Sequence, residues 1–286
     1  MKDKQRIVIK VGTSTLTYEN GKANLRKVEK LCKVISDLEN QGHEMVLVSS
    51  GALGVGMGKL GITTRPTETN KKQAIAAVGQ CELMFMYDKF FDEYNNVVSQ
   101  ILLTKYVVET PHKEETVRNT FMSLIDMGII PVVNENDSVA TDELEGNKIG
   151  DNDQLSAIVA KIINADKLII LTDIDGLYDK NPATNSDAKK INTVELITDE
   201  IKAMAGGRGS NRGTGGMATK ILAAEIATEV GIDVQIISGE NPETIYDVFE
   251  GKPVGTIFMG KEKDNDCNWT NGCQSKGSCK STFCCR

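Results

Sequence analysis

Short apolar runs typical of β-strands alternate with longer stretches of helical period along most of this chain. Such alternation favours a parallel sheet with helices on both faces, because each parallel crossover needs a connection long enough to hold a helix. We therefore predict an α/β fold, a three-layer sandwich whose central sheet is mainly parallel. The predicted strands are Ile7–Val11, Met45–Val48, Val97–Leu103, Ile130–Val133, Lys167–Leu171, Val234–Ile237 and Thr256–Phe258, and the predicted helices are Leu25–Leu38, Lys71–Phe91, Thr116–Met127, Asp153–Ile163, Thr198–Met204, Met217–Val230 and Pro242–Glu250.

Small and polar residues follow three of the predicted strands at the point where each strand ends. Ser49–Gly54, Asn134–Asp137 and Thr172–Tyr178 each come directly after an apolar run. Each segment alone is ordinary turn chemistry. Because the carboxyl ends of parallel strands meet at one edge of a sheet, where ligands bind, we expect the three segments to converge on one site.

A glycine-rich segment, Arg212–Lys220, ends in a lysine just before the helical run Ile221–Ala227. Glycines let backbone N–H groups approach phosphate oxygens, a helix N-terminus favours negative charge, and a lysine adds a full positive charge. The segment is not a Walker A loop, because that motif needs Ser or Thr where Ile221 stands. It indicates a phosphate site of another kind, and the alternative is a surface loop with a solvated lysine.

The first predicted strand, Ile7–Val11, contains Lys10. Burying an unpaired ammonium group is costly, so Lys10 should lie near the carboxyl end of the strand and face an anion, a carboxylate or open solvent. The alternative is a lysine on an edge strand that discourages aggregation. The strand alone leaves both interpretations open.

Two aspartates flank an asparagine at Asp151–Asp153, immediately before a helical pattern. One such residue suffices to cap a helix, which is the simplest interpretation. Three in succession, on a chain with two unusual lysines, indicate an acidic group placed between cations to fix their direction. We expect an aspartate in that position to have a lowered pKa and to stay ionised.

A second glycine-rich segment, Gly56–Gly61, matches the dinucleotide pattern GxGxxG. The context does not fit that motif, because the next strand, which should end in an acidic residue, is replaced by the helical run Gln73–Val78. We therefore rank nicotinamide binding well below phosphate binding.

Charge and hydropathy exclude several classes of function. The 286 residues carry a net charge of -7, with an isoelectric point near 5.1, which argues against nucleic-acid binding driven by bulk charge. No apolar run approaches the roughly 18 residues that span a bilayer, and the first residues lack the apolar core of a signal peptide. We expect a cytoplasmic protein whose partners are neither membranes nor nucleic acids.

The cysteines fall into two groups. Cys32 and Cys81 stand alone in helical patterns, and we expect both to pack as small apolar residues. Five more lie in residues 263–286, a segment without helical or strand period that we interpret as a disordered tail. Their spacing does not match a CxxC…CxxC zinc framework, so we assign the tail no function.

Six segments occur in the order found in the glutamate 5-kinases, a branch of the amino acid kinase family: IVIKVGTSTL, VSSGALGVG, IIPVVNENDSV, GDNDQLSA, LTDIDGLY and GTGGMATK. The resemblance spans residues 5–260, and its NEND and GDND blocks distinguish the chain from sister kinases of acetylglutamate, carbamate, aspartate and UMP. It implies the amino acid kinase fold over residues 1–262. The N-terminal part would bind glutamate, and residues from about 165 to 260 would bind ATP.

The resemblance implies ATP-dependent phosphorylation of the side-chain carboxylate of L-glutamate, the first step of proline biosynthesis, with Mg²⁺ bridging phosphate oxygens. Lys10 and Lys220 would flank the transferred group, and Asp153 would hold both lysines, which makes these three the implied catalytic residues. The implied substrate-binding residues are Ser50, Gly51, Ala52, Asp137, Asp151 and Asn152. The implied ATP-binding residues are Lys10, Thr172, Asp173, Thr214, Gly215, Gly216, Met217, Ala218, Thr219 and Lys220. No residue is nominated as a metal ligand.

The resemblance further implies a homo-oligomer and feedback inhibition by proline. Many relatives carry an additional β-rich module resembling PUA domains, and this chain resembles the shorter form that lacks it. Two alternatives stay open: a sister kinase with another acceptor, and an amino-acid sensor that has lost phosphoryl transfer. The sensor is disfavoured because Lys10, Asp153 and Lys220 are all present.

Overall fold

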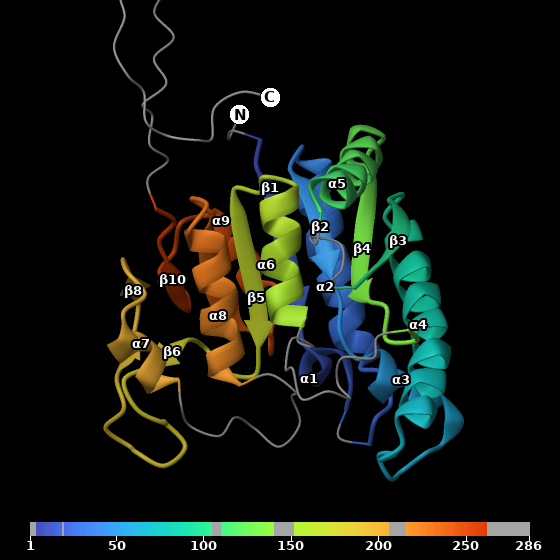
Figure 1. The fold of residues 1–286 in the computed structure, drawn as a ribbon, viewed down its shortest axis with the longest axis horizontal. Helices are drawn as coiled ribbons and strands as arrows, with labels where there is room; N and C mark the ends of the chain where they lie inside the picture. Colours follow the sequence, from blue (N-terminus) through green and yellow to red (C-terminus); the bar gives the residue numbers. More distant parts are fainter. Residues whose placement is uncertain (1–3, 19, 105–109, 140–151, 206–215, 262–286) are drawn as a thin grey trace, which may run out of the picture.

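The computed structural model describes residues 4–18, 20–104, 110–139, 152–205 and 216–261. Its centre is an eight-stranded sheet with the order β3-β4-β2-β1-β5-β9-β10-β8 (Figure 1). The strands of this sheet are β1 (Arg6–Val11), β2 (Glu44–Val48), β3 (Val97–Leu103), β4 (Ile129–Glu135), β5 (Lys167–Thr172), β8 (Thr193–Val194), β9 (Asp233–Ser238) and β10 (Thr256–Phe258). A separate two-stranded sheet pairs β6 (Leu177–Tyr178) with β7 (Lys190–Ile191).

Helices cover both faces of the large sheet. They are α1 (Thr13–Leu16), α2 (Leu25–Asn40), α3 (Ala52–Leu60), α4 (Thr69–Asp92), α5 (Pro111–Asp126), α6 (Asn152–Ile162), α7 (Asp199–Met204), α8 (Met217–Thr228) and α9 (Thr244–Phe249). Six neighbouring strands, from β3 to β9, pair in parallel, and only β10 is antiparallel to its neighbour β9. The predicted α/β sandwich with a mainly parallel sheet is therefore confirmed.

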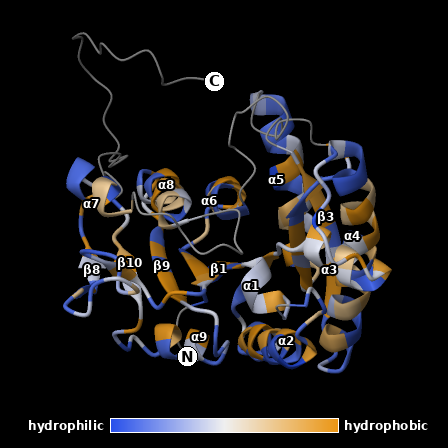
Figure 2. Cartoon of the chain, turned by 90° about the horizontal axis from the view of Figure 1, so that it is seen from below, coloured by the Kyte–Doolittle hydropathy of each residue, from blue (hydrophilic) through white to orange (hydrophobic). Residues whose placement is uncertain are grey.

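The alternation of side chains along β1 explains the two layers of the core. Ile7, Ile9 and Val11 belong to one buried cluster, which they share with α2, α4 and α9. Val8 belongs to the other cluster, which it shares with α5, α6 and α8. Figure 2 shows hydrophobic residues of α2 and α9 facing the sheet from one side and those of α6 and α8 facing it from the other. A residue two positions after Val8, namely Lys10, therefore points toward α6 and α8.

Helix α3 was not predicted, because its sequence is rich in glycine, which has a low helix propensity. Its glycines serve close packing instead. A methyl group at Gly56 would lie 2.0 Å from the carbonyl oxygen of Ile75, and one at Gly79 would lie 1.8 Å from that of Ala52. Helices α3 and α4 thus touch backbone to backbone. The GxGxxG segment belongs to this helix contact and does not form a strand–turn–helix phosphate loop.

Two further predictions need correction. Helix α5 begins at Pro111, five residues before the predicted Thr116, because Thr110 caps it by accepting a hydrogen bond from the Lys113 amide and Pro111 suits the first turn. Cys32 is fully buried as predicted, but Cys81 is exposed. Cys81 stands on the side of α4 that borders a cavity, together with Gln80 and Met84.

The large sheet runs without a break through the described residues, since central β1 pairs with β2 on one side and with β5 on the other. The division of residues 1–262 into glutamate-binding and ATP-binding parts stays a prediction. The tail that we expected at 263–286 lies outside the described residues. Within the described ranges, no helix combines the length and the apolar character that crossing a membrane requires.

Candidate active site

The carboxyl ends of β1, β2, β4 and β5 meet at one edge of the sheet (Figure 1). Lys10 lies there on β1, opposite Val48 of β2 and Ile170 of β5. Its strand is central, so the edge-strand interpretation of this lysine is wrong. Lys10 is only 5% exposed, and a buried ammonium group in this position needs an anionic partner.

Asp153 of α6 is the partner of Lys10 and also of Lys220 on α8. Lys10 Nζ lies 2.5 Å from Asp153 Oδ1, and Lys220 Nζ lies 3.0 Å from Asp153 Oδ2. Asp153 is fully buried and Lys220 is 5% exposed. Each carboxylate oxygen therefore orients one ammonium group, and the three side chains together carry one excess positive charge. Such a charge at the edge of a sheet favours an anionic ligand.

The protonation of Asp153 follows from its surroundings. Burial by itself would raise the pKa of this carboxyl group, but the ammonium groups of Lys10 and Lys220 lower the pKa below its ordinary value of 3.8. Asp153 is therefore ionised at neutral pH, and the two ion pairs persist there.

Local structure holds the cluster in place. Helices α6 and α8 pack against each other, Thr219 Oγ1 donates to Asp153 Oδ2 at 3.0 Å, and Ser156 Oγ donates to the Asp153 carbonyl oxygen at 2.6 Å. Lys220 stands in the first turn of α8, which begins at Met217 after the extended residue Gly216. The first backbone N–H groups of a helix have no acceptor within the helix and point outward from its N-terminus. This arrangement suits a phosphate group.

A second polar cluster lies beside the first and joins β2, β4 and α6. Asn152 Nδ2 donates to Ser50 Oγ and to Asn134 Oδ1, each at 3.1 Å. Ser50 and Asn134 are both buried. Gly51 follows Ser50 with a φ of 89°, a conformation that favours glycine, and α3 starts at the next residue, Ala52. The turn after β2 thereby presents Ser50 toward α6.

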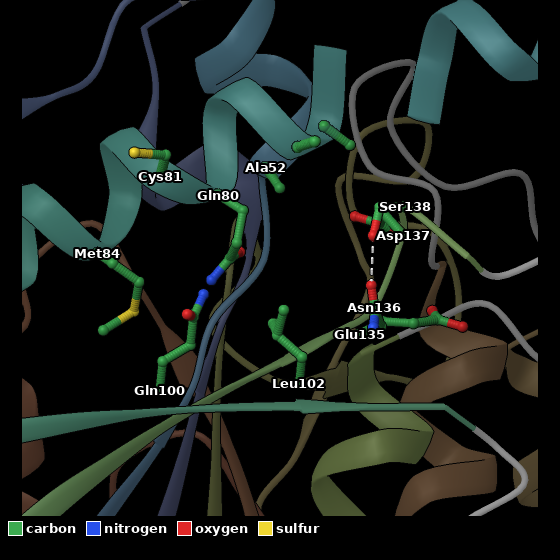
Figure 3. Close-up of a pocket in the computed structure, with 12 residues that line it drawn as sticks. Ala52, Gln80, Cys81, Met84, Gln100, Leu102, Glu135, Asn136, Asp137 and Ser138 are labelled. Atoms are coloured by element: carbon green, nitrogen blue, oxygen red, sulfur yellow. Dashed lines mark hydrogen bonds between the residues drawn. The ribbon is translucent and has the colours of Figure 1, made fainter. Parts of the chain in front are cut away.

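Asp137 lies in the loop after β4, where a cavity of about 370 Å³ opens between that loop, α4 and β3. Figure 3 shows the Asp137 carboxylate on one side of this cavity, and the side-chain amides of Gln80 and Gln100 close together on the other. Ser138 donates to Asn136 Oδ1 at 2.6 Å in the same loop. The cavity thus has acidic, amide and apolar walls, which suit a small polar molecule with a positively charged group.

Some of the remaining predicted site residues lie at the same edge of the sheet or in α8, and the others lie outside the described residues. Thr172 ends β5 at the same edge of the sheet and donates to Asp173 Oδ1 at 3.0 Å, while its carbonyl oxygen accepts from the Gly239 amide at 2.6 Å. Met217 and Ala218 belong to the first turn of α8. The predicted residues Asp151, Thr214 and Gly215 lie outside the described residues.

Two residues of this region were not nominated from the sequence. Asn134 was noted only as the start of a polar segment, and Gln80 was overlooked within a helical run. In the structure Asn134 Nδ2 donates to Gln80 Oε1 at 2.8 Å. The available signal for Gln80 was a polar residue at helical spacing from apolar ones, one turn after Ala76 and one turn before Met84.

Comparisons with known proteins agree on the family. The sequence pattern of the amino acid kinase family matches residues 5–238. A glutamate 5-kinase of Clostridium perfringens is 56% identical over 263 residues, which cover 92% of this chain and 98% of that protein. A glutamate 5-kinase of Listeria innocua is 53% identical over 265 residues, which cover 92% of this chain and 96% of that protein.

Solved structures show the same fold at low sequence identity. UMP kinase from Bacillus anthracis superposes with a TM-score of 0.60 at 17% identity, covering 90% of this chain and 96% of that one. UMP kinase from Ureaplasma parvum superposes with a TM-score of 0.61 at 15% identity, covering 90% and 99%. At such identities the likeness concerns the fold alone. The match to the family pattern and the identity to curated relatives together establish that this chain belongs to the amino acid kinase family.

Proposed function

We propose that this protein transfers the γ-phosphoryl group of ATP to the side-chain carboxylate of L-glutamate, giving L-glutamyl 5-phosphate and ADP. The observation that carries the proposal is the buried pair of lysines, Lys10 and Lys220, on the two oxygens of Asp153. The choice of glutamate is supported by relatives of that name at 53–56% identity over 92% of the chain. The product supplies proline biosynthesis.

Phosphoryl transfer depends mainly on positioning and on neutralising charge, since little covalent chemistry is left to the protein. A glutamate carboxylate oxygen forms a bond to the γ-phosphorus while the bond from that phosphorus to the bridging oxygen breaks, and ADP leaves with the electron pair. Lys10 and Lys220 reach this group from β1 and α8. The acceptor is already an anionic nucleophile, so no general base is needed.

The phosphates of ATP would bind at the N-terminus of α8. Gly216 precedes the helix, Met217, Ala218 and Thr219 belong to its first turn, and Lys220 adds the charge. We assign Thr214 and Gly215 to the same loop from the resemblance. Thr172 and Asp173 would contact the nucleotide from the end of β5.

Glutamate would bind on the side of β2 and β4. The resemblance assigns Ser50, Gly51, Ala52, Asp151 and Asn152 to glutamate binding. Asp137 is the best candidate to bind the α-ammonium group, because it supplies a carboxylate to the wall of the cavity.

Mg²⁺ fits this site as a companion of the nucleotide. In the described ranges no group of three or more His, Cys, Asp or Glu residues could hold a metal ion. Asp153 is already bound to two lysines, so it is not a free ligand. When bound through ATP, Mg²⁺ supplies further neutralisation of the phosphate oxygens while keeping most of its water ligands.

The test is ADP release in the presence of ATP and Mg²⁺ with L-glutamate, N-acetylglutamate, aspartate, carbamate and UMP as separate acceptors. Hydroxylamine traps an acyl phosphate as a hydroxamate. We expect turnover that is selective for glutamate and forms the hydroxamate. Selective turnover of another acceptor would keep the phosphate site and overturn the substrate assignment. No turnover with any acceptor would favour the amino-acid sensor.

From the same likeness we propose inhibition by proline, assembly into a homo-oligomer and a cytoplasmic location. The first two are tested by adding proline to the glutamate assay and by measuring the mass of the protein in solution. A proline concentration series that leaves glutamate turnover unchanged would contradict the inhibition, and a monomeric mass would contradict the assembly.

A further inference from the structure

We propose that Gln80 of helix α4 is a positioning residue for the acceptor site, because it sets the direction in which the side-chain amides of Asn134 and Asn152 point. The inference deepens the proposed function and rests on it. Gln80 is half-buried in the wall of the cavity (Figure 3). It accepts a hydrogen bond from Asn134 Nδ2, whereas Asn152 donates to Asn134 Oδ1.

A backbone group constrains the orientation of the Asn134 side-chain amide. The Glu135 amide donates to Asn134 Oδ1 at 2.9 Å. A backbone N–H can only donate, so the oxygen of the Asn134 side chain must face it and the nitrogen must point the other way. This chemical constraint distinguishes the two orientations of the amide, which are otherwise similar in shape.

Gln80 accepts a hydrogen bond from the side-chain nitrogen of Asn134, which points away from the Glu135 amide. Asn134 Nδ2 donates to Gln80 Oε1 at 2.8 Å, and Asn134 is only 1% exposed. A buried amide nitrogen without an acceptor would lose the free energy of a hydrogen bond to water. Gln80 therefore stabilises the orientation in which the Asn134 oxygen is directed at Asn152.

The direction of the Asn134 amide in turn determines the direction of the hydrogen bonds made by the proposed substrate-binding residue Asn152. Asn152 Nδ2 donates to both Asn134 Oδ1 and Ser50 Oγ, so Asn152 Oδ1 must point elsewhere. That oxygen is buried and has no hydrogen-bond partner within the described part of the chain. Buried acceptors are normally satisfied, so Asn152 Oδ1 is suited to accept a hydrogen bond from a ligand, as the α-ammonium group of an amino acid would donate.

Ser50 is placed to donate a hydrogen bond to a ligand, whereas Asn152 is placed to accept one. Its oxygen accepts the hydrogen bond from Asn152, so its hydroxyl hydrogen stays available to donate to a substrate carboxylate. Gln80 thus acts through Asn134 on two residues that distinguish the charged groups of the acceptor. It stands on a rigid support, because the neighbouring Gly79 packs directly on the Ala52 carbonyl of α3.

The test compares two acceptors in three variants. Glutarate has the two carboxylates of glutamate and no ammonium group. Gln80→Leu removes the acceptor for Asn134, and Gln80→Glu keeps an acceptor oxygen at the same place. Gln100→Leu makes the same apolar change in a side chain of β3 whose amide lies close to that of Gln80 in the cavity. Thermal unfolding of each variant reports any loss of folding.

For Gln80→Leu we expect the KM for glutamate to rise about tenfold, with kcat and the KM for ATP changed less than about twofold. The ratio of kcat/KM for glutamate to that for glutarate should fall by a similar factor. Gln80→Glu should restore the glutamate KM to within about threefold of wild type. A merely structural role would not produce this selective loss and its rescue.

The outcomes separate the two proposals. Wild-type turnover of glutamate together with an unchanged glutamate-to-glutarate ratio in Gln80→Leu overturns the role of Gln80 alone. An equal loss in Gln100→Leu, or no rescue by Gln80→Glu, also overturns it, because the polarity of the cavity would then explain the effect. Wild-type protein that does not phosphorylate glutamate overturns the proposed function, and the role of Gln80 falls with it.

Discussion

Lys220 Nζ lies 3.0 Å from Asp153 Oδ2, although the two residues are 67 positions apart in the chain and both are buried. Their contact joins the first turn of α8 to the start of α6. Lys10 of β1 holds the other oxygen of the same carboxylate. One carboxylate thus sets the positions of two cations that come from two further elements, which is the preorganisation that transfer of a charged group requires.

Substitution of Lys220 by Met should lower kcat about 10²–10³-fold, because one preorganised cation is lost from the transferring group. The KM for glutamate should change little, since Lys220 lies on the nucleotide side. The measurement is steady-state ADP release at saturating ATP. Lys202→Met is the matched control, because Lys202 forms an ion pair with Glu225 and its side chain is 40% exposed. Equal activity in the two variants would refute the role of Lys220.

Asp153→Asn should lower the free energy of unfolding by about 3–5 kcal/mol, because two buried ammonium groups lose their carboxylate. Urea unfolding at pH 7 measures the change. The control is Asp175→Asn, since Asp175 pairs with Lys190 at 3.2 Å and its side chain is 51% exposed. An exposed pair contributes at most about 1 kcal/mol. If Asp153→Asn had the same free energy of unfolding as wild type, the buried cluster would not be held together by this charge.

The pH dependence of stability should report the same carboxylate. Because the folded-state pKa of Asp153 is lowered, its stabilising contribution is complete above the ordinary value of 3.8 and is lost as the pH falls through the folded-state value. The difference in unfolding free energy between wild type and Asp153→Asn should therefore stay constant from about pH 7 to pH 5 and shrink below pH 3.8. A difference that already shrinks between pH 7 and pH 5 would indicate a raised pKa instead.

Gly79→Ala should destabilise the protein by about 1–3 kcal/mol, because the added methyl group forces α3 and α4 apart. It would lie 1.8 Å from the Ala52 carbonyl oxygen, next to the turn that presents Ser50. We therefore also expect a raised KM for glutamate. Thermal unfolding and ADP release measure the two effects.

Val78→Ala is the control for Gly79→Ala, because Val78 is 38% exposed on the outer side of the same helix. It should leave both quantities close to wild type. A stability of Gly79→Ala equal to that of Val78→Ala would mean that the backbone contact between α3 and α4 is not tight in solution.

Much of the fold could be predicted because strand and helix periods are local properties of the sequence. Every predicted strand exists, and the lysine at the end of β1 was recognised as unusual. Helix α3 could not be recognised, because its glycines oppose a helix locally and are favoured only by the close approach of α4. Cys81 was expected to pack because it stands alone in a helical pattern, but which positions of α4 are covered depends on the tertiary packing of that helix.

The candidate site was predicted in part. Lys10, Asp153 and Lys220 could be nominated because charged residues stood at strand and helix ends where burial would be costly. Gln80 could not be nominated, since its role depends on the direction of a hydrogen bond from Asn134 on β4. The spacing of Gln80 marks it only as a polar residue among apolar positions of a helix, and it indicates neither the partner nor the direction of the bond.

The sequence by itself determined the alternation of strands and helices, the chemical kind of each residue at the strand ends and hence the class of fold. Only the tertiary structure decided that β1 is central and which oxygen of Asp153 each of Lys10 and Lys220 contacts. The reason is physical: period and propensity act between residues a few positions apart. The order of strands and the packing of α6 on α8 arise from burial of apolar surface between segments that are distant in the chain.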